Sequence, residues 1–241
     1  MLIGISGKIG SGKDTVGLII QYLLLKNEHP YYYKDLRFDE VVDLDDADKA
    51  LDIASSVEIK KYAYKLKQII SILTGATLTE LEDQRFKERS IPGWGLTYRE
   101  LLQKVGTDAM RNQVIEDIWE KALFIDYKSK SNAWVITDTR FPNEAKAIKK
   151  REGLVIRVTR NTCGKCKSIN TKEVICYKEN YVCGLICNDC GHNTDYTLDH
   201  ASETGLDEYK DFDYIINNNG TIDDLIEKVK NVLILSNFIS K

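Results

Sequence analysis

Near the N-terminus, the apolar run Leu2-Ile-Gly-Ile5 leads into the glycine-rich segment Gly7-Lys-Ile-Gly-Ser-Gly12-Lys13-Asp14-Thr15, and these residues are the strongest indication of the fold. The apolar run indicates a short buried strand, and a helical pattern follows the glycines. Glycines let backbone N–H groups point into one concavity, and the N-terminus of a helix adds positive potential there. This order of strand, loop and helix predicts a loop that binds the phosphates of a nucleotide.

Lys13 is expected to supply a mobile positive charge for the β- and γ-phosphates. Asp14 stands where Ser or Thr is usual in phosphate loops of this spacing, so the hydroxyl that faces Mg²⁺ is expected from Thr15. The alternative interpretation is a glycine-rich turn that binds no ligand. The residues expected to contact the nucleotide here are Gly7, Gly10, Gly12, Lys13, Asp14 and Thr15.

Outward from this loop, strands and helices alternate along the chain. Apolar runs predict further strands at about 57–62, 133–137, 154–158 and 214–216. Helical patterns separate them, at 66–73, in several pieces over 77–128, at 143–150 and from Thr221 onward. The alternation predicts an α/β fold, with a mostly parallel sheet flanked by helices. Residues 28–56 break the pattern with three tyrosines and an acidic stretch, and we interpret them as a surface insertion with room for a short helix.

Composition narrows the class of protein. The 241 residues include 34 Lys and Arg against 37 Asp and Glu, a formal net charge of −3, which argues against a protein that coats nucleic acid. The most apolar run, Leu18 to Leu25, contains Gln21 and is far shorter than the roughly 20 residues that span a bilayer. The N-terminus lacks a signal-peptide pattern, so a cytoplasmic protein without membrane partners is expected. The composition is as compatible with an oligomer as with a monomer.

A second polar site is expected after the strand at 133–137. Asp138 follows that strand directly, and a carboxylate at such a strand end can hold Mg²⁺. Arg140 can neutralise the charge that develops on a transferred phosphoryl group. The alternative is that Asp138 caps a turn or the following helix.

All six cysteines lie between 163 and 190. Cys163-Gly-Lys-Cys166 and Cys187-Asn-Asp-Cys190 form two Cys-x2-Cys pairs, the pattern of a zinc ribbon, in which four thiolates make a tetrahedral site. Cys176 and Cys183 lie between the pairs and are the less favoured ligands. The pattern predicts one structural Zn²⁺ on Cys163, Cys166, Cys187 and Cys190.

Several motifs, in this order, make the chain similar to the deoxynucleoside monophosphate kinases of tailed bacteriophages, which have the P-loop nucleoside monophosphate kinase fold. The Gly-Lys-Asp-Thr form of the phosphate loop is typical of that family. The other matching motifs are Leu101-Leu-Gln-Lys-Val-Gly-Thr-Asp108, Asp138-Thr-Arg140 with Glu144, Gly153-Leu-Val-Ile-Arg-Val-Thr-Arg160, His200-Ala-Ser-Glu203-Thr-Gly-Leu206 and Ile216-Asn-Asn-Asn-Gly-Thr-Ile-Asp-Asp-Leu225.

The resemblance implies a role for each motif. ATP with Mg²⁺ would occupy residues 7–15, with its base near Asn217 and Gly220, and Lys13, Asp138 and Arg140 would act in phosphoryl transfer. A helical region at 63–130 would hold the acceptor monophosphate. Trp94 there is expected either to stack on the acceptor base or to be an ordinary buried tryptophan. The residues implied for the acceptor are Lys67, Trp94, Arg99, Asp108 and Glu144.

The resemblance also places the cysteine-rich insert, at 161–198, where nucleoside monophosphate kinases have the lid that closes over ATP. The expected activity of the whole domain, 1–241, is transfer of the γ-phosphoryl group of ATP to a deoxynucleoside 5′-monophosphate. Two alternatives stay open: a kinase for another small phosphorylated acceptor, such as phosphomevalonate or dephospho-coenzyme A, and a non-catalytic ATP-binding module whose zinc ribbon binds nucleic acid or a partner protein.

Overall fold

The structure is a computed structural model that describes residues 1–42, 57–128, 133–160, 171–176, 181–189, 191, 193–195 and 204–240. The chain forms two compact units. The sheet unit consists of Met1–Ile59 and Ser129–Lys241, and the helical unit consists of Lys60–Lys128. Each is described by itself.

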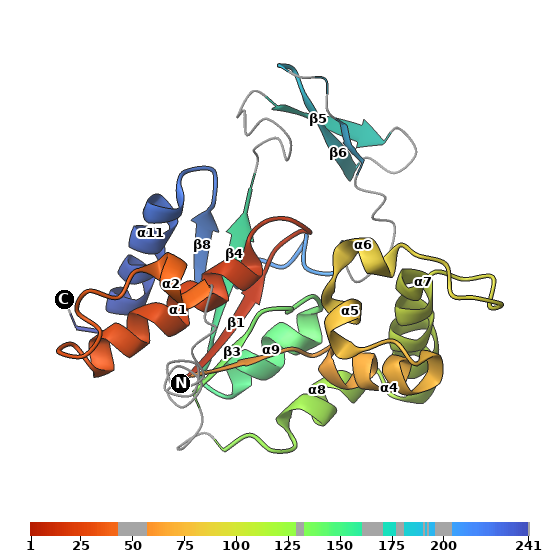
Figure 1. The fold of residues 1–241 in the computed structure, drawn as a ribbon, viewed down its shortest axis with the longest axis horizontal. Helices are drawn as coiled ribbons and strands as arrows, with labels where there is room; N and C mark the ends of the chain where they lie inside the picture. Colours follow the sequence, from red (N-terminus) through yellow and green to blue (C-terminus); the bar gives the residue numbers. More distant parts are fainter. Residues whose placement is uncertain are drawn as a thin grey trace. The chain divides into compact units, whose positions relative to one another are not determined.

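A five-stranded sheet in the order β2-β3-β1-β4-β8 forms the centre of the sheet unit (Figure 1). Strand β1 pairs in parallel with both β3 and β4, and β4 pairs in parallel with β8, so the carboxyl ends of these four strands meet at one edge. The predicted α/β fold with a mostly parallel sheet is confirmed. The strands are β1 (Leu2–Ser6), β2 (Glu58–Lys60), β3 (Trp134–Ile136), β4 (Leu154–Thr159) and β8 (Tyr214–Asn217).

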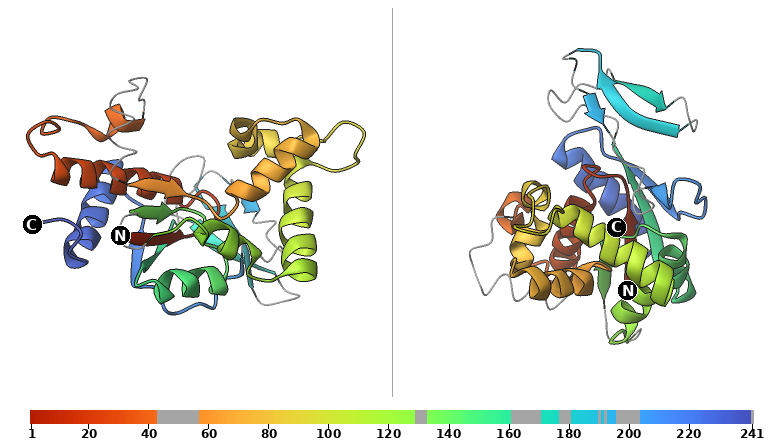
Figure 2. Two further views of the ribbon diagram at one scale, coloured as in Figure 1. Left: turned by 90° about the horizontal axis from the view of Figure 1, so that it is seen from below. Right: turned by 90° about the vertical axis from the view of Figure 1, so that its right-hand side faces the viewer.

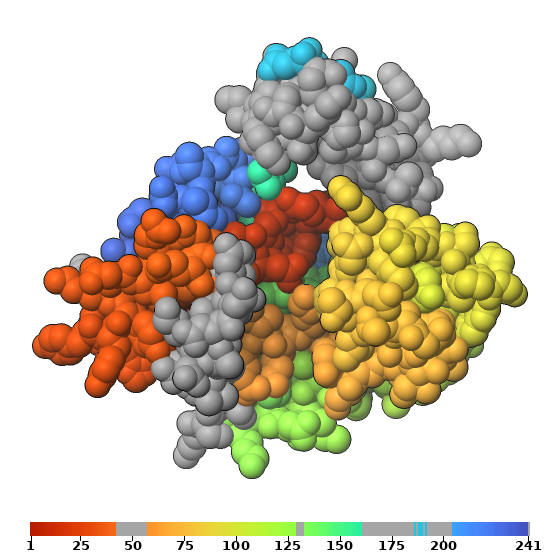
Figure 3. All heavy atoms as spheres, in the orientation of Figure 1, coloured from red at the N-terminus to blue at the C-terminus, as the bar shows by residue number. Residues whose placement is uncertain are grey.

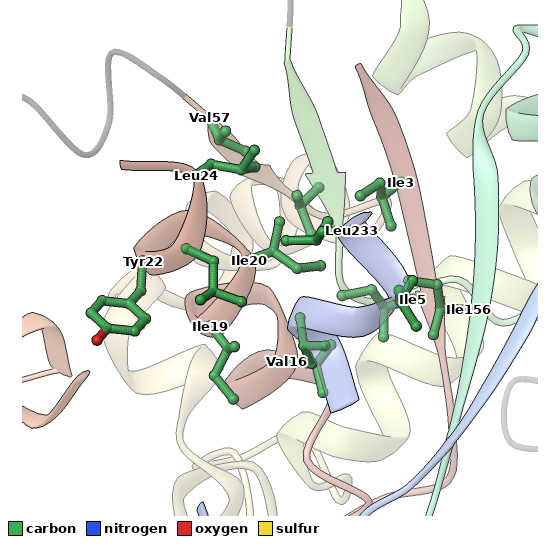
Figure 4. Close-up of a cluster of buried hydrophobic side chains, with 14 of the residues drawn as sticks. Ile3, Ile5, Val16, Ile19, Ile20, Tyr22, Leu24, Val57, Ile156 and Leu233 are labelled. Carbon is green, nitrogen blue, oxygen red and sulfur yellow. The ribbon is translucent and has the colours of Figure 1, made fainter. Parts of the chain in front are cut away.

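Helices cover both faces of this sheet, because successive side chains of a strand point to opposite faces. Ile3 and Ile5 of β1 are buried in the cluster that α1 (Lys13–Glu28) and α11 (Ile222–Leu235) form on one face (Figure 4). Gly4 lies against α9 (Pro142–Lys150) on the other face, where an added Cβ would come 2.3 Å from Cδ1 of Ile148. Figure 2 shows α1 and α9 on opposite sides of the sheet.

Only part of the region predicted as a surface insertion lies on the surface. Tyr31 and Tyr32 are 94% and 88% exposed, but Leu36 and Val41 are buried in the sheet unit's core. The hydroxyl of Tyr22 on α1 donates to the carbonyl of Leu36 (3.1 Å), and the expected short helix is α2 (Phe38–Val42). The apolar residues here pack on α1, which a reading based on charge could not detect, and residues 43–56 lie outside the described part of the chain.

Five α-helices and a π-helix make up the described helical unit: α4 (Tyr64–Thr74), α5 (Leu78–Glu82), α6 (Gln84–Lys87), α7 (Tyr98–Gln103), η1 (Lys104–Val114) and α8 (Ile118–Phe124). Helices α5 and α7 begin with capping boxes, in which threonine and glutamate satisfy the first N–H groups. The π-helix was not predicted. Gly106 lets it approach α4, since an added Cβ would lie 2.6 Å from Cδ2 of Leu66, and its carbonyl accepts from Nε1 of Trp119 (2.8 Å).

A separate antiparallel sheet consists of β5 (Thr171–Cys176), β6 (Tyr181–Cys187) and β7 (Asn193–Asp195). Thr171 pairs with Cys187, and Cys176 pairs with Tyr181 at the other end of the hairpin. Cys163, Cys166 and Cys190, three of the four predicted zinc ligands, lie outside the described residues. Among the residues that are described, no helix is both long and apolar enough to cross a bilayer.

Candidate functional site

The phosphate loop connects β1 to α1 at the carboxyl edge of the parallel strands (Figure 1). Gly12 is the N-cap of α1 with a φ of 95°, and Gly10 has a φ of 73°, a left-handed region that favours glycine. The N-cap Gly12 has no side chain that could cap α1, so the helix begins directly at the glycine-rich loop. Gly7 lies close to β4, where an added Cβ would be 2.5 Å from the carbonyl oxygen of Val158. The predicted strand, loop and helix are confirmed.

Lys13 is the first residue of α1, and its Nζ donates to the carbonyl of Lys8 within the loop (2.9 Å). Oδ1 of Asp14 accepts a hydrogen bond from Oγ1 of Thr137 (2.8 Å), which follows β3. Asp14 is therefore directed to the strand end that Asp138 also occupies, and Thr15 lies half-buried in the same first turn. Carboxylate and hydroxyl oxygens of this kind are the donors that Mg²⁺ prefers.

Sequence reasoning missed Asn218, which holds the loop in place. Its Nδ2 donates to the carbonyl of Ser11 (2.9 Å), and its backbone N–H donates to Thr159 (2.7 Å). An added Cβ at Gly12 would lie only 2.4 Å from that Nδ2. The alternation of side chains along a strand could have indicated Asn218. Ile216 is a buried strand residue, and a period of two puts residue 218 on the same face of the sheet.

The predicted base-site residues have other surroundings. Asn217 is exposed, and its Oδ1 accepts from the backbone of Asn219 (3.1 Å). Gly220 lies against Asp224, which together with Thr221 forms the predicted capping box of α11. Asn217 is the last residue of β8 and Gly220 precedes α11, so the two residues flank the segment that contains Asn218.

After β3, the chain turns at Asp138 and α9 begins at Pro142. Oε2 of Glu144 accepts from the backbone N–H groups of Arg140 (2.7 Å) and Phe141 (3.1 Å), and Glu144 is only 2% exposed. Glu144 thus satisfies the N–H groups of the two residues before α9. Its buried carboxylate fixes the backbone from which Arg140 extends.

In the helical unit, Lys67 is almost buried, and its Nζ lies 2.6 Å from Oε1 of Glu82. Nζ of Lys61 contacts the other oxygen of the same carboxylate at 3.0 Å. Burial by itself would raise the pKa of Glu82, but the hydrogen bonds and positive charges of the two lysines outweigh it and hold the pKa below its usual value. Two cations thus share one carboxylate.

Arg99 is held in a similar way. Its Nε lies 2.5 Å from Oε1 of Glu88, and its NH2 donates to Oε1 of Gln84 (2.8 Å). Trp94 is at the tip of a loop between two glycines with positive φ and is 45% exposed, so it is no ordinary buried tryptophan. Asp108 lies exposed on η1. The partners of Lys67 and Arg99 both come from residues 82–88, which sequence reasoning did not single out.

Within the residues that the structure describes, no three His, Cys, Asp or Glu side chains come together as a metal site. The described part of the chain includes only Cys187 of the predicted zinc set, at the end of β6.

Residues 34–190 match the model of the family described as deoxynucleotide monophosphate kinase. The chain is also similar to the deoxynucleotide monophosphate kinase of Enterobacteria phage T4, with 28% identity over 139 residues. That alignment covers 56% of this chain and 44% of the phage protein, so the chain matches less than half the length of this curated relative. The family match begins after the phosphate loop and contains the whole helical unit.

Proposed function

The chain belongs to the deoxynucleotide monophosphate kinase family, and on this premise we propose that it transfers the γ-phosphoryl group of ATP to a deoxynucleoside 5′-monophosphate. The observation that carries the proposal is the backbone loop with left-handed Gly12, which opens α1 and places Lys13 at its first position. A helix N-terminus that follows a glycine-rich loop, with a lysine at its first position, suits the triphosphate of ATP. The sheet unit is therefore proposed to bind ATP, with its base near Asn217 and Gly220.

The helical unit is proposed to bind the acceptor. A guanidinium offers two parallel donors to a phosphate, so Arg99 suits the acceptor phosphate, and Lys67 adds a second cation. The exposed ring of Trp94 is available for stacking on the base. Asp108 is proposed to contact the acceptor from η1.

No protein nucleophile is required for this reaction. An anionic oxygen of the acceptor phosphate forms a bond to Pγ, the bond from Pγ to the β–γ bridging oxygen breaks, and ADP leaves with that electron pair. Catalysis is then positioning and neutralisation of charge. Lys13 follows the transferred group, and Arg140 meets the charge that develops on it, from a backbone that Glu144 holds.

Asp14, Thr15 and Asp138 would hold Mg²⁺. Asp14 and Thr15 lie in the first turn of α1, and Oδ1 of Asp14 accepts from Oγ1 of Thr137, the chain neighbour of Asp138. When bound, the ion would neutralise charge on the β- and γ-phosphates.

The zinc ribbon is also part of the proposal. Strand β5 begins five residues after Cys166, and its first residue, Thr171, pairs with Cys187. The antiparallel hairpin thus supports the two Cys-x2-Cys pairs as one ligand set, whereas Cys176 belongs to its other end. Zn²⁺ bound there would stabilise a small lid insert. Purified protein is expected to contain about one zinc per chain, lost on Cys187→Ser. A zinc-free, fully active protein would contradict this.

The activity is tested by incubating the protein with Mg²⁺-ATP and each of the four deoxynucleoside monophosphates and their ribose counterparts, and by following ADP and the nucleoside diphosphate. We expect ADP and the nucleoside diphosphate to form in equal amounts with at least one of the four deoxynucleoside monophosphates. Turnover only with a different phosphorylated acceptor would indicate that the protein is a P-loop kinase with another acceptor specificity. ATP binding without turnover on any acceptor would favour a non-catalytic module.

A further inference from the structure

A cluster beside the phosphate loop is built around Asp207, which no motif singled out. Oδ1 of Asp207 lies 2.9 Å from NH2 of Arg157, and its Oδ2 forms an ion pair with Nζ of Lys8. Lys8 belongs to the phosphate loop, whereas Asp207 lies 199 positions further along the chain. One carboxylate therefore joins the loop to the end of β4.

The Arg157 arm of this cluster fixes the point where the loop begins. Arg157 and Ser6 are paired in the parallel register of β1 and β4, and NH1 of Arg157 donates to Oγ of Ser6 (2.9 Å). The Arg157 side chain is only 14% exposed, and its guanidinium lies 5.6 Å from the centre of the Phe212 ring. A guanidinium enclosed in this way has one favoured position, so Asp207 is tied to the last residue of β1.

The Lys8 arm continues to the proposed catalytic lysine. The carbonyl of Lys8 accepts from Nζ of Lys13 (2.9 Å) and from the backbone N–H of Ser11 (3.2 Å). The position of that carbonyl depends on the Lys8 backbone, and the Lys8 side chain is bound to Asp207. A continuous chain of contacts thus runs from Asp207 through Lys8 to Lys13.

We propose that Asp207 is a positioning residue for ATP, which holds the phosphate loop in its binding conformation through Lys8 and Arg157. The inference rests on the proposed function, because it assigns the loop to ATP. Asp207 itself is not a ligand of the nucleotide. Its carboxylate fixes the first half of the loop at two points, one on each side of Gly7.

The direction in which Asp207→Asn changes the affinity for ATP distinguishes the positioning role from a purely electrostatic effect. Replacing Asp207 by Asn removes a negative charge near an anion site, which alone would strengthen the binding of ATP. It also removes the carboxylate charge that Lys8 and Arg157 share, so these two cations are no longer held together and the loop loses this support. The positioning role predicts that the second effect is larger and that ATP binds more weakly.

The test is titration of the whole protein with ATP in the absence of acceptor, followed by steady-state kinetics. Asp207→Asn is expected to raise the Kd and KM for ATP about tenfold, equivalent to about 1.4 kcal/mol. The KM for the acceptor and the kcat at saturating ATP should change less than about twofold, since Lys13 still reaches the bound phosphates. A general loss of folded protein would not produce this selective change.

The matched control is Asp213→Asn. Asp213 also pairs with a lysine, Lys149, and its Oδ2 accepts from the backbone N–H of Val155 (2.7 Å) near the start of β4. It fixes the opposite end of the same strand and should leave the Kd for ATP unchanged. Lys8→Met supplies a second variant: in its background, Asp207→Asn should weaken ATP binding much less than it does in the wild type.

Unchanged or tighter ATP binding in Asp207→Asn, or an equal loss in Asp213→Asn, would overturn the positioning role. Additive effects of Asp207→Asn and Lys8→Met would overturn the path through Lys8. A wild-type protein that binds ATP but phosphorylates no nucleotide would contradict the proposed kinase activity only, and the same titration would still decide the role of Asp207. A wild-type protein that binds no ATP would overturn both.

Discussion

The phosphate loop of the sheet unit is shaped by its backbone, whereas the cations of the helical unit are held by side chains. Gly12 has a φ of 95° and the loop is braced by an asparagine amide and by strand β4. Lys67 and Arg99 instead depend on the carboxylates of Glu82 and Glu88. In Figure 3, blue residues of the C-terminal part lie beside orange residues of the N-terminal part on one face of the sheet unit, where α1 and α11 are in contact.

This difference determines what a substitution can do. A backbone site loses its shape when a glycine or a bracing amide is replaced, and the loss affects folding as well as binding. A side-chain site loses one cation at a time, and each loss should appear as a change in the KM of one substrate.

The largest effect is expected for Lys13→Ala. In the proposed reaction, the ammonium group of Lys13 follows the γ-phosphoryl group into the transition state, so its loss should lower kcat by about 10²- to 10³-fold, or roughly 3–4 kcal/mol. Steady-state turnover with saturating substrates measures it. Lys150→Ala, an exposed lysine at the end of α9, is the control. Near-normal turnover of Lys13→Ala would remove the phosphate loop from the mechanism.

Asn218→Ala should come next, because it removes the donor that binds the Ser11 carbonyl and leaves that buried acceptor unpaired. Such a loss costs about 1–3 kcal/mol of the free energy of unfolding. Urea denaturation of the variant measures it, with the exposed Asn231→Ala on α11 as the control. Equal stability of the two variants would show that the loop does not need this brace.

Glu82→Gln tests the side-chain site. Without the carboxylate, Lys67 and Lys61 lose their shared partner, so the KM for the acceptor should rise about tenfold, equivalent to about 1.4 kcal/mol, while the KM for ATP stays unchanged. Glu80→Gln, on the same helix, changes a carboxylate that only caps α5 with Thr77. A comparable rise in Glu80→Gln would indicate damage to the helix rather than loss of a positioning carboxylate.

The smallest effect is a pH dependence of stability. The pKa of Glu82 is lowered in the folded protein, so its contribution to stability is present above the ordinary glutamate pKa of about 4.3. It is lost as the pH falls through the lowered folded pKa. The free energy of unfolding of wild type should exceed that of Glu82→Gln at pH 7 by less than about 1 kcal/mol, since the pair is partly exposed. A difference that persisted in acid would contradict this assignment.

The two sites also differ in how far they were predictable from the sequence. The phosphate loop was predictable because its glycines, Lys13 and the neighbouring strand and helix are adjacent in the chain. The buried position of Asn218 was predictable from the alternation of side chains along the preceding strand. Glu82 and Glu88 were not, because their role depends on how α5 and α6 pack beside α4 and α7. Asp207 was not either, since its partner Lys8 is 199 positions away.

We propose that the sheet unit binds ATP and that the helical unit binds the nucleoside monophosphate. The most direct measurement is separate calorimetric titration of ATP and of the preferred deoxynucleotide into wild type, Lys13→Ala and Glu82→Gln. Lys13→Ala should weaken the binding of ATP and leave deoxynucleotide binding unchanged, and Glu82→Gln should do the reverse. If Glu82→Gln weakened ATP binding while deoxynucleotide binding stayed at the wild-type value, the assignment of the two units would be wrong.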